Sequence, residues 1–139
     1  MFATLFFGIL DPRSGSLHYI NAGHEPLYVK NNTGIKTVIK PTGPAVGMLP
    51  DSDYRVGRVQ LAQGDILVGY TDGVTDARSP LDELFTRSRL RTILAQPFAS
   101  AGELIEGVKS SVFSFIDVAP RDDDVTMLAV QRTGGELPA

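Results

Sequence analysis

The sequence predicts a single α+β domain in which most of the strands precede the helices. Strand-like runs separated by turn residues fill residues 2–70, whereas apolar residues recur at helical spacing after Ala77. A strand pattern returns at residues 125–131, so the expected order is six strands, two helices and one strand. This grouping favours the α+β class over a doubly wound parallel sheet. We expect one domain over residues 1–132 and a tail over residues 133–139.

The first expected strand, residues 2–10, is a nearly continuous apolar run, which is typical of a strand covered on both faces. Turn residues between Asp11 and Gly15 should return the chain into a second strand at residues 17–22. Further strands are expected at residues 26–30, 35–39, 54–61 and 66–70, the last of them short and buried. The alternation slips at residues 57–58, which predicts a β-bulge there.

Two helices are expected in the second half of the chain. Leu90, Ile93 and Leu94 have the spacing of a short helix. Ser100 and Glu103 form the pattern of a capping box, in which each side chain bonds an amide at the helix start. Behind this cap, one apolar stripe is expected to face the core: Leu104, Ile105, Val108, Val112 and Phe115.

Composition excludes several classes of function. The chain has no cysteine, which removes disulfide frameworks, thiolate metal sites and cysteine nucleophiles and is compatible with a cytoplasmic location. The net charge is −3 without a basic cluster, so we expect no nucleic-acid partner. There is no apolar run long enough to span a membrane, and the apolar start lacks the features of a signal peptide. A nucleophile elbow and a phosphate-binding loop are also absent.

The first candidate for chemistry is Asp72, which directly follows the expected buried strand at residues 66–70 and precedes Gly73. A strand that ends in Asp-Gly places a carboxylate on a rigid element, and glycine lets the backbone turn away. An ordinary Asp-Gly turn explains these residues equally well.

The second candidate is the acidic triplet of residues 122–124, immediately before the last strand. Adjacent carboxylates repel one another, so either a solvated loop or a bound cation must offset that cost. Oxygen ligands without cysteine favour Mg²⁺ or Mn²⁺ over zinc. If the strands beside Asp72 and Asp123 are neighbours, the two carboxylates converge at one end of a sheet.

A third candidate is His24, which follows the strand at residues 17–22. An isolated histidine in this position can be a ligand, an acid or base, or a phosphate contact, but it is more often a structural residue in a turn. No catalytic role is assigned to it from the sequence.

Six short segments follow one another across nearly the whole chain: FATLFFGILD at 2–11, YINAGHEP at 19–26, GPAVGM at 43–48, LAQGD at 61–65, YTDGVTDA at 70–77 and DDVT at 123–126. This ordered set resembles the SpoIIE-type branch of the PPM (protein phosphatase 2C-like) metal-dependent phosphatases. The resemblance implies a two-sheet antiparallel β-sandwich flanked by helices. It also implies a two-metal centre in which activated water attacks phosphoserine or phosphothreonine. By motif, Asp72 and Asp123 are metal ligands, and Asp124 supports the site.

The family also has an earlier Gly-Asp-Val-x-Gly-His-Gly element whose aspartate bridges both metals, and this sequence does not contain it. We therefore expect the C-terminal part of such a domain, with its N-terminal strands missing, a weak or partial Mn²⁺ or Mg²⁺ site, and no activity in isolation. The uncovered strand at residues 2–10 should favour a homo-oligomer. The expected partner of the parent enzyme is a phosphorylated anti-sigma-factor antagonist. The alternative is a non-catalytic phosphoprotein-binding module, while a purely structural β-domain leaves both acidic motifs unexplained.

Overall fold

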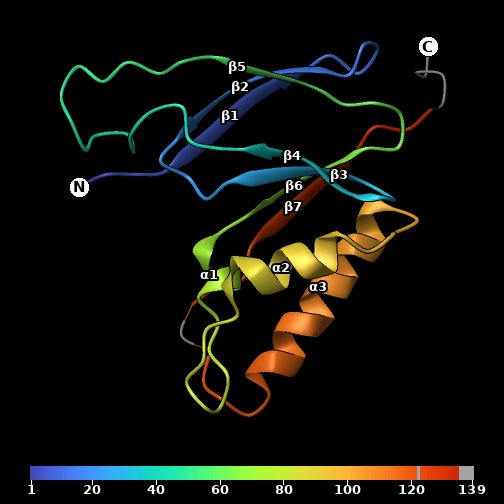
Figure 1. Cartoon of the computed structure of the whole chain (residues 1–139). Coiled ribbons are helices and arrows are strands. Elements are labelled where there is room, and N and C mark those ends of the chain that lie inside the picture. Colours follow the sequence, from blue (N-terminus) through green and yellow to red (C-terminus); the bar gives the residue numbers. More distant parts are fainter. Residues whose placement is uncertain (122, 135–139) are drawn as a thin grey trace.

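Two antiparallel sheets and a group of helices make up the computed structural model, which describes residues 1–121 and 123–134 (Figure 1). One sheet has the strand order β1-β2-β5 and the other the order β4-β3-β6-β7. The strands are β1 (Leu5–Leu10), β2 (Ser16–Ala22), β3 (Leu27–Asn31), β4 (Gly34–Ile39), β5 (Gly57–Gln60), β6 (Ile66–Tyr70) and β7 (Met127–Gln131). The helices are α1 (Asp72–Thr75), α2 (Thr86–Leu94) and α3 (Ala101–Ile116). The expected α+β sandwich is confirmed, while most of the expected tail, residues 135–139, lies outside the described residues.

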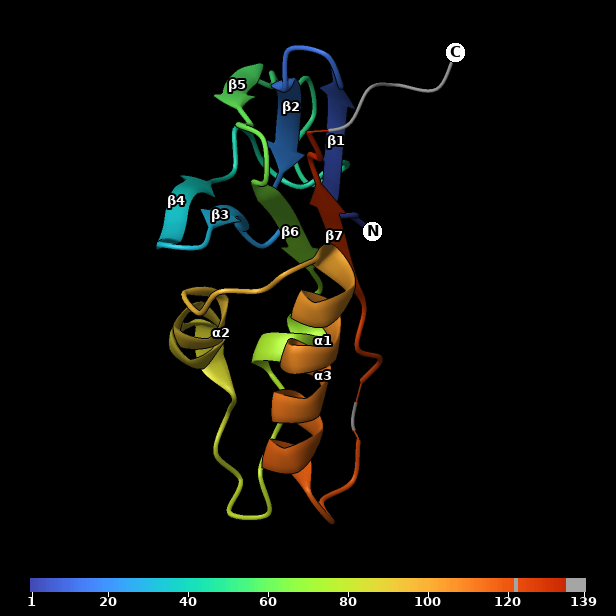
Figure 2. The same cartoon turned by 90° about the vertical axis from the view of Figure 1, so that its right-hand side faces the viewer.

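The domain has three layers, because all three helices lie on the same side of the four-stranded sheet (Figure 2). One apolar core lies between this sheet and the helices and includes Val68, Leu90 and Leu104. A smaller core lies between the two sheets and includes Leu17 and Leu67. Every residue of β6 is buried since both faces of this strand are covered, as the sequence predicted.

The long helix α3 begins as the sequence predicted. The Ser100 side chain accepts a hydrogen bond from the Glu103 amide at 3.1 Å, and the Glu103 carboxylate accepts one from the Ala99 amide at 3.0 Å. The second bond thus reaches one residue further out than in the expected box. The buried positions of α3 are Leu104, Val108, Val112 and Ile116. Among the described residues, none of the helices combines the length and the apolar character that a membrane span requires.

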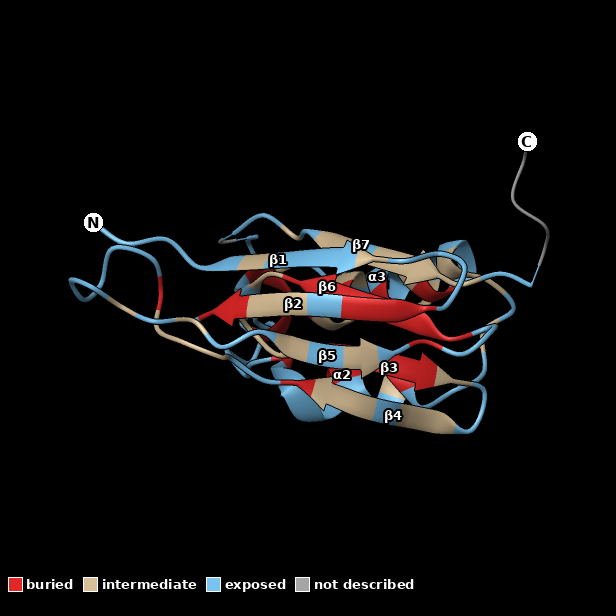
Figure 3. Ribbon diagram, turned by 90° about the horizontal axis from the view of Figure 1, so that it is seen from above, coloured by how far each residue is buried: buried red, intermediate tan, exposed pale blue. Residues whose placement is uncertain are grey.

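The prediction that the first strand is buried on both faces is wrong. β1 is an edge strand of the smaller sheet, and no element among the described residues covers its outer face (Figure 3). Phe6 and Leu10 pack against the core between the sheets. Phe7 and Ile9, which lie on the opposite face, are 57% and 65% exposed. An apolar run by itself does not reveal how many layers cover a strand.

The β-bulge predicted at residues 57–58 is also wrong. β5 pairs with β2 in unbroken register from Tyr19 opposite Gly57 to Ser16 opposite Gln60, and the residues before Gly57 lie outside the strand. The irregularity occurs instead in the β3–β4 pair, between Val29 and Lys30. The slip in the sequence pattern therefore marks the start of a strand.

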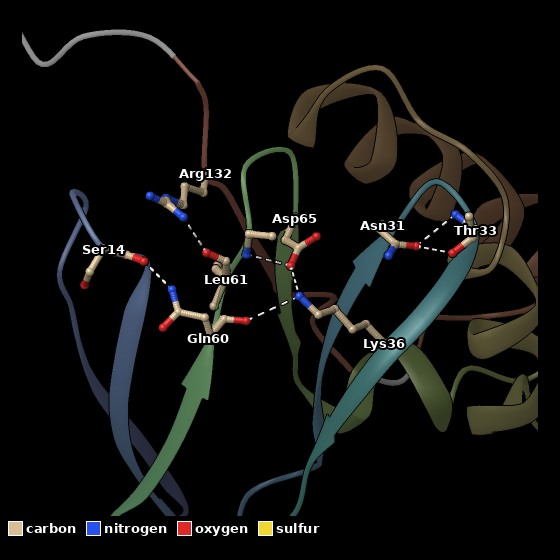
Figure 4. Close-up of polar contacts among 9 residues, drawn as sticks. Ser14, Asn31, Thr33, Lys36, Gln60, Leu61, Asp65 and Arg132 are labelled. Atoms are coloured by element: carbon tan, nitrogen blue, oxygen red, sulfur yellow. Dashed lines mark hydrogen bonds and ion pairs between the residues drawn. The ribbon is translucent and has the colours of Figure 1, made fainter.

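Polar contacts join the two sheets at the end opposite α1 (Figure 4). Asp65 is buried, and its carboxylate accepts hydrogen bonds from Lys36 Nζ at 2.6 Å and from the Ala62 amide at 2.9 Å. The guanidinium of Arg132 donates to the Leu61 carbonyl at 2.8 Å. These contacts fix the loop between β5 and β6, so the chain passes from one sheet to the other in a defined position.

Candidate metal centre

The two acidic segments meet because β6 and β7 are neighbours. These strands pair in antiparallel register, with Tyr70 opposite Met127 at the end of the ladder. The Thr71 amide then donates a hydrogen bond to the Thr126 carbonyl at 3.1 Å, which extends the pairing by one step. The residue that follows Thr71 is Asp72, so this aspartate emerges beside the acidic segment that precedes β7. The strands beside Asp72 and Asp123 are therefore neighbours, which is the condition set above for the two acidic motifs to meet at one end of a sheet.

Gly73 allows the two segments to touch. It is buried in α1, and a Cβ atom at this position would overlap the carbonyl oxygen of Asp124. Gly73 is not among the glycines with positive φ, so glycine is required here for close approach and not for an unusual backbone conformation. Asp72 accordingly begins a one-turn helix, which the sequence pattern did not predict, in place of a simple Asp-Gly turn.

The carboxylates of Asp72, Asp123 and Asp124 are exposed at this edge. Asp123 Oδ1 accepts a hydrogen bond from the Asp124 amide at 2.8 Å, and Asp122 lies outside the described residues. Asp72 and Asp123 line two different cavities. Within residues 1–121 and 123–134, no three metal-ligating side chains form a cluster that could hold an ion. The oxygen donors suit a hard divalent cation, but they supply only part of its coordination shell.

His24 lies next to Asp72 in a cavity of about 150 Å³ that is lined by Thr4, Gly23, His24, Glu25, Thr71 and Asp72. The backbone amide of His24 donates to the side chain of the buried Asn21 at 2.8 Å. Gly23 has a φ of 65°, and a Cβ there would crowd Ala45 of the neighbouring loop. The tight turn after β2 therefore brings the imidazole to the same edge as Asp72.

An ion pair between Glu25 and Arg87 was not predicted, and it joins this turn to α2. The Arg87 guanidinium lies 2.7 Å from the Glu25 carboxylate, and the hydrogen bond to Glu25 raises the pKa of Arg87. Close by, burial raises the pKa of Tyr70, whose ring stacks on that of Tyr28. The two members of the ion pair are 62 residues apart, so no local sequence signal could have revealed their contact.

Comparison with known proteins agrees with this geometry. A family model described as Stage II sporulation protein E (SpoIIE) matches residues 1–133. Protein IcfG of Synechocystis sp. is 49% identical over 132 residues, which are 95% of this chain and 21% of that protein. Phosphoserine phosphatase RsbU of Bacillus subtilis is 27% identical over 133 residues, again 95% of this chain and 39% of that protein. The chain thus spans well under half the length of these curated relatives.

Among solved structures, the manganese-presoaked phosphatase domain of SpoIIE from Bacillus subtilis superposes with a TM-score of 0.70 at 18% identity. The alignment covers 98% of this chain and 59% of that one, which confirms the two-sheet phosphatase fold. Because the family model extends over nearly the whole sequence, this chain belongs to the SpoIIE family, whose members are PPM-type serine/threonine phosphatases.

Proposed function

We propose that the chain is the C-terminal part of a metal-dependent phosphatase domain that hydrolyses phosphoserine or phosphothreonine on a regulatory protein. The observation that carries this proposal is the pairing of Thr71 with Thr126, together with the contact of Gly73 with Asp124. These contacts place the two acidic motifs at one edge of the larger sheet. If the acidic triplet were only a solvated loop and Asp72 only part of an ordinary turn, the two segments would not need to lie in contact.

In this proposal Asp72 and Asp123 are ligands of Mn²⁺ or Mg²⁺, and Asp124 supports the site. A bound divalent cation neutralises phosphoryl charge and activates the attacking water. In this proposal carboxylate oxygens of the two aspartates hold that cation, and the close approach of Gly73 to Asp124 brings together the two backbone segments that carry them. The support for this choice of metal is that one solved SpoIIE phosphatase domain is described as manganese-presoaked and that RsbX was solved in complex with magnesium.

The isolated chain should bind the cation weakly and lack turnover, since the described residues offer no third ligand beside Asp72 and Asp123. The same observation favours a second candidate, a module that binds a phosphoprotein without hydrolysing it. In either case the proposed partner is a phosphorylated protein of the anti-sigma-factor antagonist type, met in the cytoplasm. The support for a phosphoserine substrate is the name of the relative RsbU.

Titration calorimetry with Mn²⁺ tests the metal site directly. The Asp72→Asn and Asp123→Asn variants should each lose the weak binding of the wild-type chain, because each removes one of two anionic ligands. Asp82→Asn is the matched control, since Asp82 is an exposed acid paired with Arg78. Equal Mn²⁺ affinity in all four proteins would contradict the assignment. Rapid Mn²⁺-dependent hydrolysis of p-nitrophenyl phosphate by this chain would contradict its inactivity.

We also propose that the chain self-associates through β1. This edge strand presents unpaired backbone groups and the exposed side chains of Leu5, Phe7 and Ile9. Such an edge favours pairing with a second strand. Sedimentation should show a concentration-dependent dimer or larger species for the wild type and a monomer for Phe7→Lys. A wild-type monomer at all concentrations would refute this assembly.

A further inference from the structure

We propose that the guanidinium group of Arg121 binds the phosphate group of the phosphoester substrate. This role rests on the proposed phosphatase function and adds a substrate-binding residue to it. Arg121 precedes the acidic segment that contains Asp123, and it lies outside the six segments that resemble the SpoIIE-type phosphatases. The resemblance therefore assigns it no role.

The side chain of Arg121 is supported by Phe113 of α3. Its Cζ atom lies over the Phe113 ring, 4.1 Å from the ring centroid. Such a contact stabilises the cation, and it occupies none of the five N–H donors with an acceptor oxygen. Because Val112 and Ile116 anchor this part of α3 in the core, the ring is a fixed support for the guanidinium.

The acidic side chains that follow Arg121 do not take up its donors. Asp123 and Asp124 are close in sequence, yet none of the ion pairs between described residues involves Arg121. By contrast, Arg78 lines a cavity with Asp123 but is paired with Asp82 at 3.0 Å. The forked donors of an arginine match two oxygens of a phosphate group. An arginine that an aromatic ring supports and no described carboxylate neutralises is suited to bind such an anion.

Two cavities place Arg121 beside the proposed metal ligands. The larger one, of about 320 Å³, is lined by Phe113, Arg121, Asp123, Asp124 and Val125. This volume lies at the lower end of the range for small-ligand pockets, about 300–1,000 Å³. A smaller cavity is also lined by Arg121 and Asp123, and it includes Gly73 of α1. The guanidinium therefore lies at the place where the two acidic motifs meet.

Charge sets a condition on binding. The carboxylates of Asp72, Asp123 and Asp124 are exposed at this edge and repel a phosphate group. Arg121 offsets one of these charges, so a phosphoester should bind only when a divalent cation offsets two more. The guanidinium and the cation both attract the phosphate but repel each other. Loss of Arg121 should therefore weaken phosphate binding without weakening metal binding, whereas loss of a purely structural residue would weaken both.

Nitrogen-15 NMR of the arginine Nε–H groups tests the contact in the wild-type chain. Arg89 is the internal control, because its guanidinium also lies over a ring, 4.6 Å from the centroid of Phe115, but it lines neither cavity. In Mg²⁺, which is diamagnetic, added phosphoserine should shift the Nε–H resonance of Arg121 and leave that of Arg89 unchanged. Without Mg²⁺ neither resonance should shift.

Variants give a second readout by titration calorimetry. Arg121→Gln should weaken the Mg²⁺-dependent affinity for phosphoserine about tenfold or more, the effect of losing hydrogen bonds to a charged group. Its Mg²⁺ affinity should equal or exceed that of the wild type. Arg121→Lys keeps the charge without the fork and should lose less affinity for phosphoserine than Arg121→Gln. Arg89→Gln, the matched control, removes a similar contact with a ring and should change neither affinity.

The outcomes distinguish this contact from the proposed function. Mg²⁺-dependent phosphoserine binding that leaves the Arg121 resonance unshifted, or that keeps its full strength in Arg121→Gln, overturns the contact and leaves the proposed function intact. A parallel loss of Mg²⁺ and phosphoserine affinity in Arg121→Gln, or an equal shift of Arg121 without Mg²⁺, also overturns the contact. Absence of any Mg²⁺-dependent phosphoserine binding by the wild type overturns the proposed function for this chain and the contact with it. The NMR experiment stands even where a variant does not fold.

Discussion

Replacing Gly73 by alanine tests the feature on which the candidate metal centre depends. The added Cβ would overlap the Asp124 carbonyl oxygen, so one of the two segments must move by about an ångström or more to restore normal contact. That movement breaks the alignment that the hydrogen bond from Thr71 to Thr126 maintains. The Gly73→Ala change therefore acts on the geometry of the site without removing any ligand.

The expected magnitude follows from three effects. Overpacking of a buried position costs about 1–3 kcal/mol, and loss of one backbone hydrogen bond costs about 1 kcal/mol. Against this, alanine is favoured over glycine inside a helix by about 1 kcal/mol. The free energy of unfolding should fall by about 1–3 kcal/mol, as measured by urea denaturation. Mn²⁺ binding, measured by calorimetry, should fall below that of the wild type.

Gly102→Ala is the matched control, because it makes the same change in a helix where, apart from the helix backbone itself, the new Cβ would meet only Ser100 Oγ, at 3.8 Å. This variant should be as stable as the wild type or more stable, with unchanged Mn²⁺ binding. Equal stability and equal metal binding of Gly73→Ala and the wild type would refute the steric reasoning. A loss of stability without a loss of metal binding would show that the site does not depend on this contact.

Two further predictions concern stability alone and are measured by urea denaturation. Asp65→Ala should lower the free energy of unfolding by about 1–3 kcal/mol, because it leaves the Ala62 amide and Lys36 without their hydrogen-bond acceptor. The control Asp82→Ala removes an exposed ion pair with Arg78 and should change the free energy of unfolding by less than about 1 kcal/mol. Equal losses in the two variants would contradict this reasoning. Lys30 is fully buried with its ammonium 5.1 Å from the Phe98 ring, and burial lowers its pKa below the ordinary value of 10.5. Lys30→Met should therefore stabilise the domain by about 1–3 kcal/mol at pH 7. Because the pKa of Lys30 is lower in the folded protein than in the unfolded chain, the wild type becomes more stable as the pH rises towards 10.5. The advantage of Lys30→Met over the wild type should therefore shrink over this pH range. The control Lys40→Met, at an exposed position, should leave the free energy of unfolding nearly unchanged. If the stability gained by Lys30→Met did not depend on pH, desolvation of the Lys30 charge would be refuted as its cause.

Much of the fold and part of the candidate site could be predicted from the sequence, because the signals are local. The apolar run of β6, the cap at Ser100 and the turn residues near Gly15 act on neighbouring residues, and all were located correctly. The acidic motif at Asp72 was also identified by its position directly after a buried strand.

Other features arise only when distant parts of the chain pack together. β1 looks like a central strand because its residues are apolar, yet sheet order makes it an edge strand with exposed Phe7 and Ile9. The bulge is another example, since the register of β3 and β4 depends on both strands and their turn. Strand-like residues indicate that a segment prefers an extended backbone, but they do not indicate which strand it pairs with, because that depends on contacts between distant parts of the chain.

The sequence by itself determined the class of fold, the order of the strands and the two longer helices, and the two acidic motifs that suggest metal chemistry. Tertiary structure alone decided that β6 lies next to β7, that Gly73 touches Asp124, and that His24 reaches the edge where Asp72 begins α1. The physical reason is that hydrogen bonds and close contacts between residues far apart in the chain depend on which surfaces the whole core brings together. Those contacts, and no local pattern, assemble the candidate site.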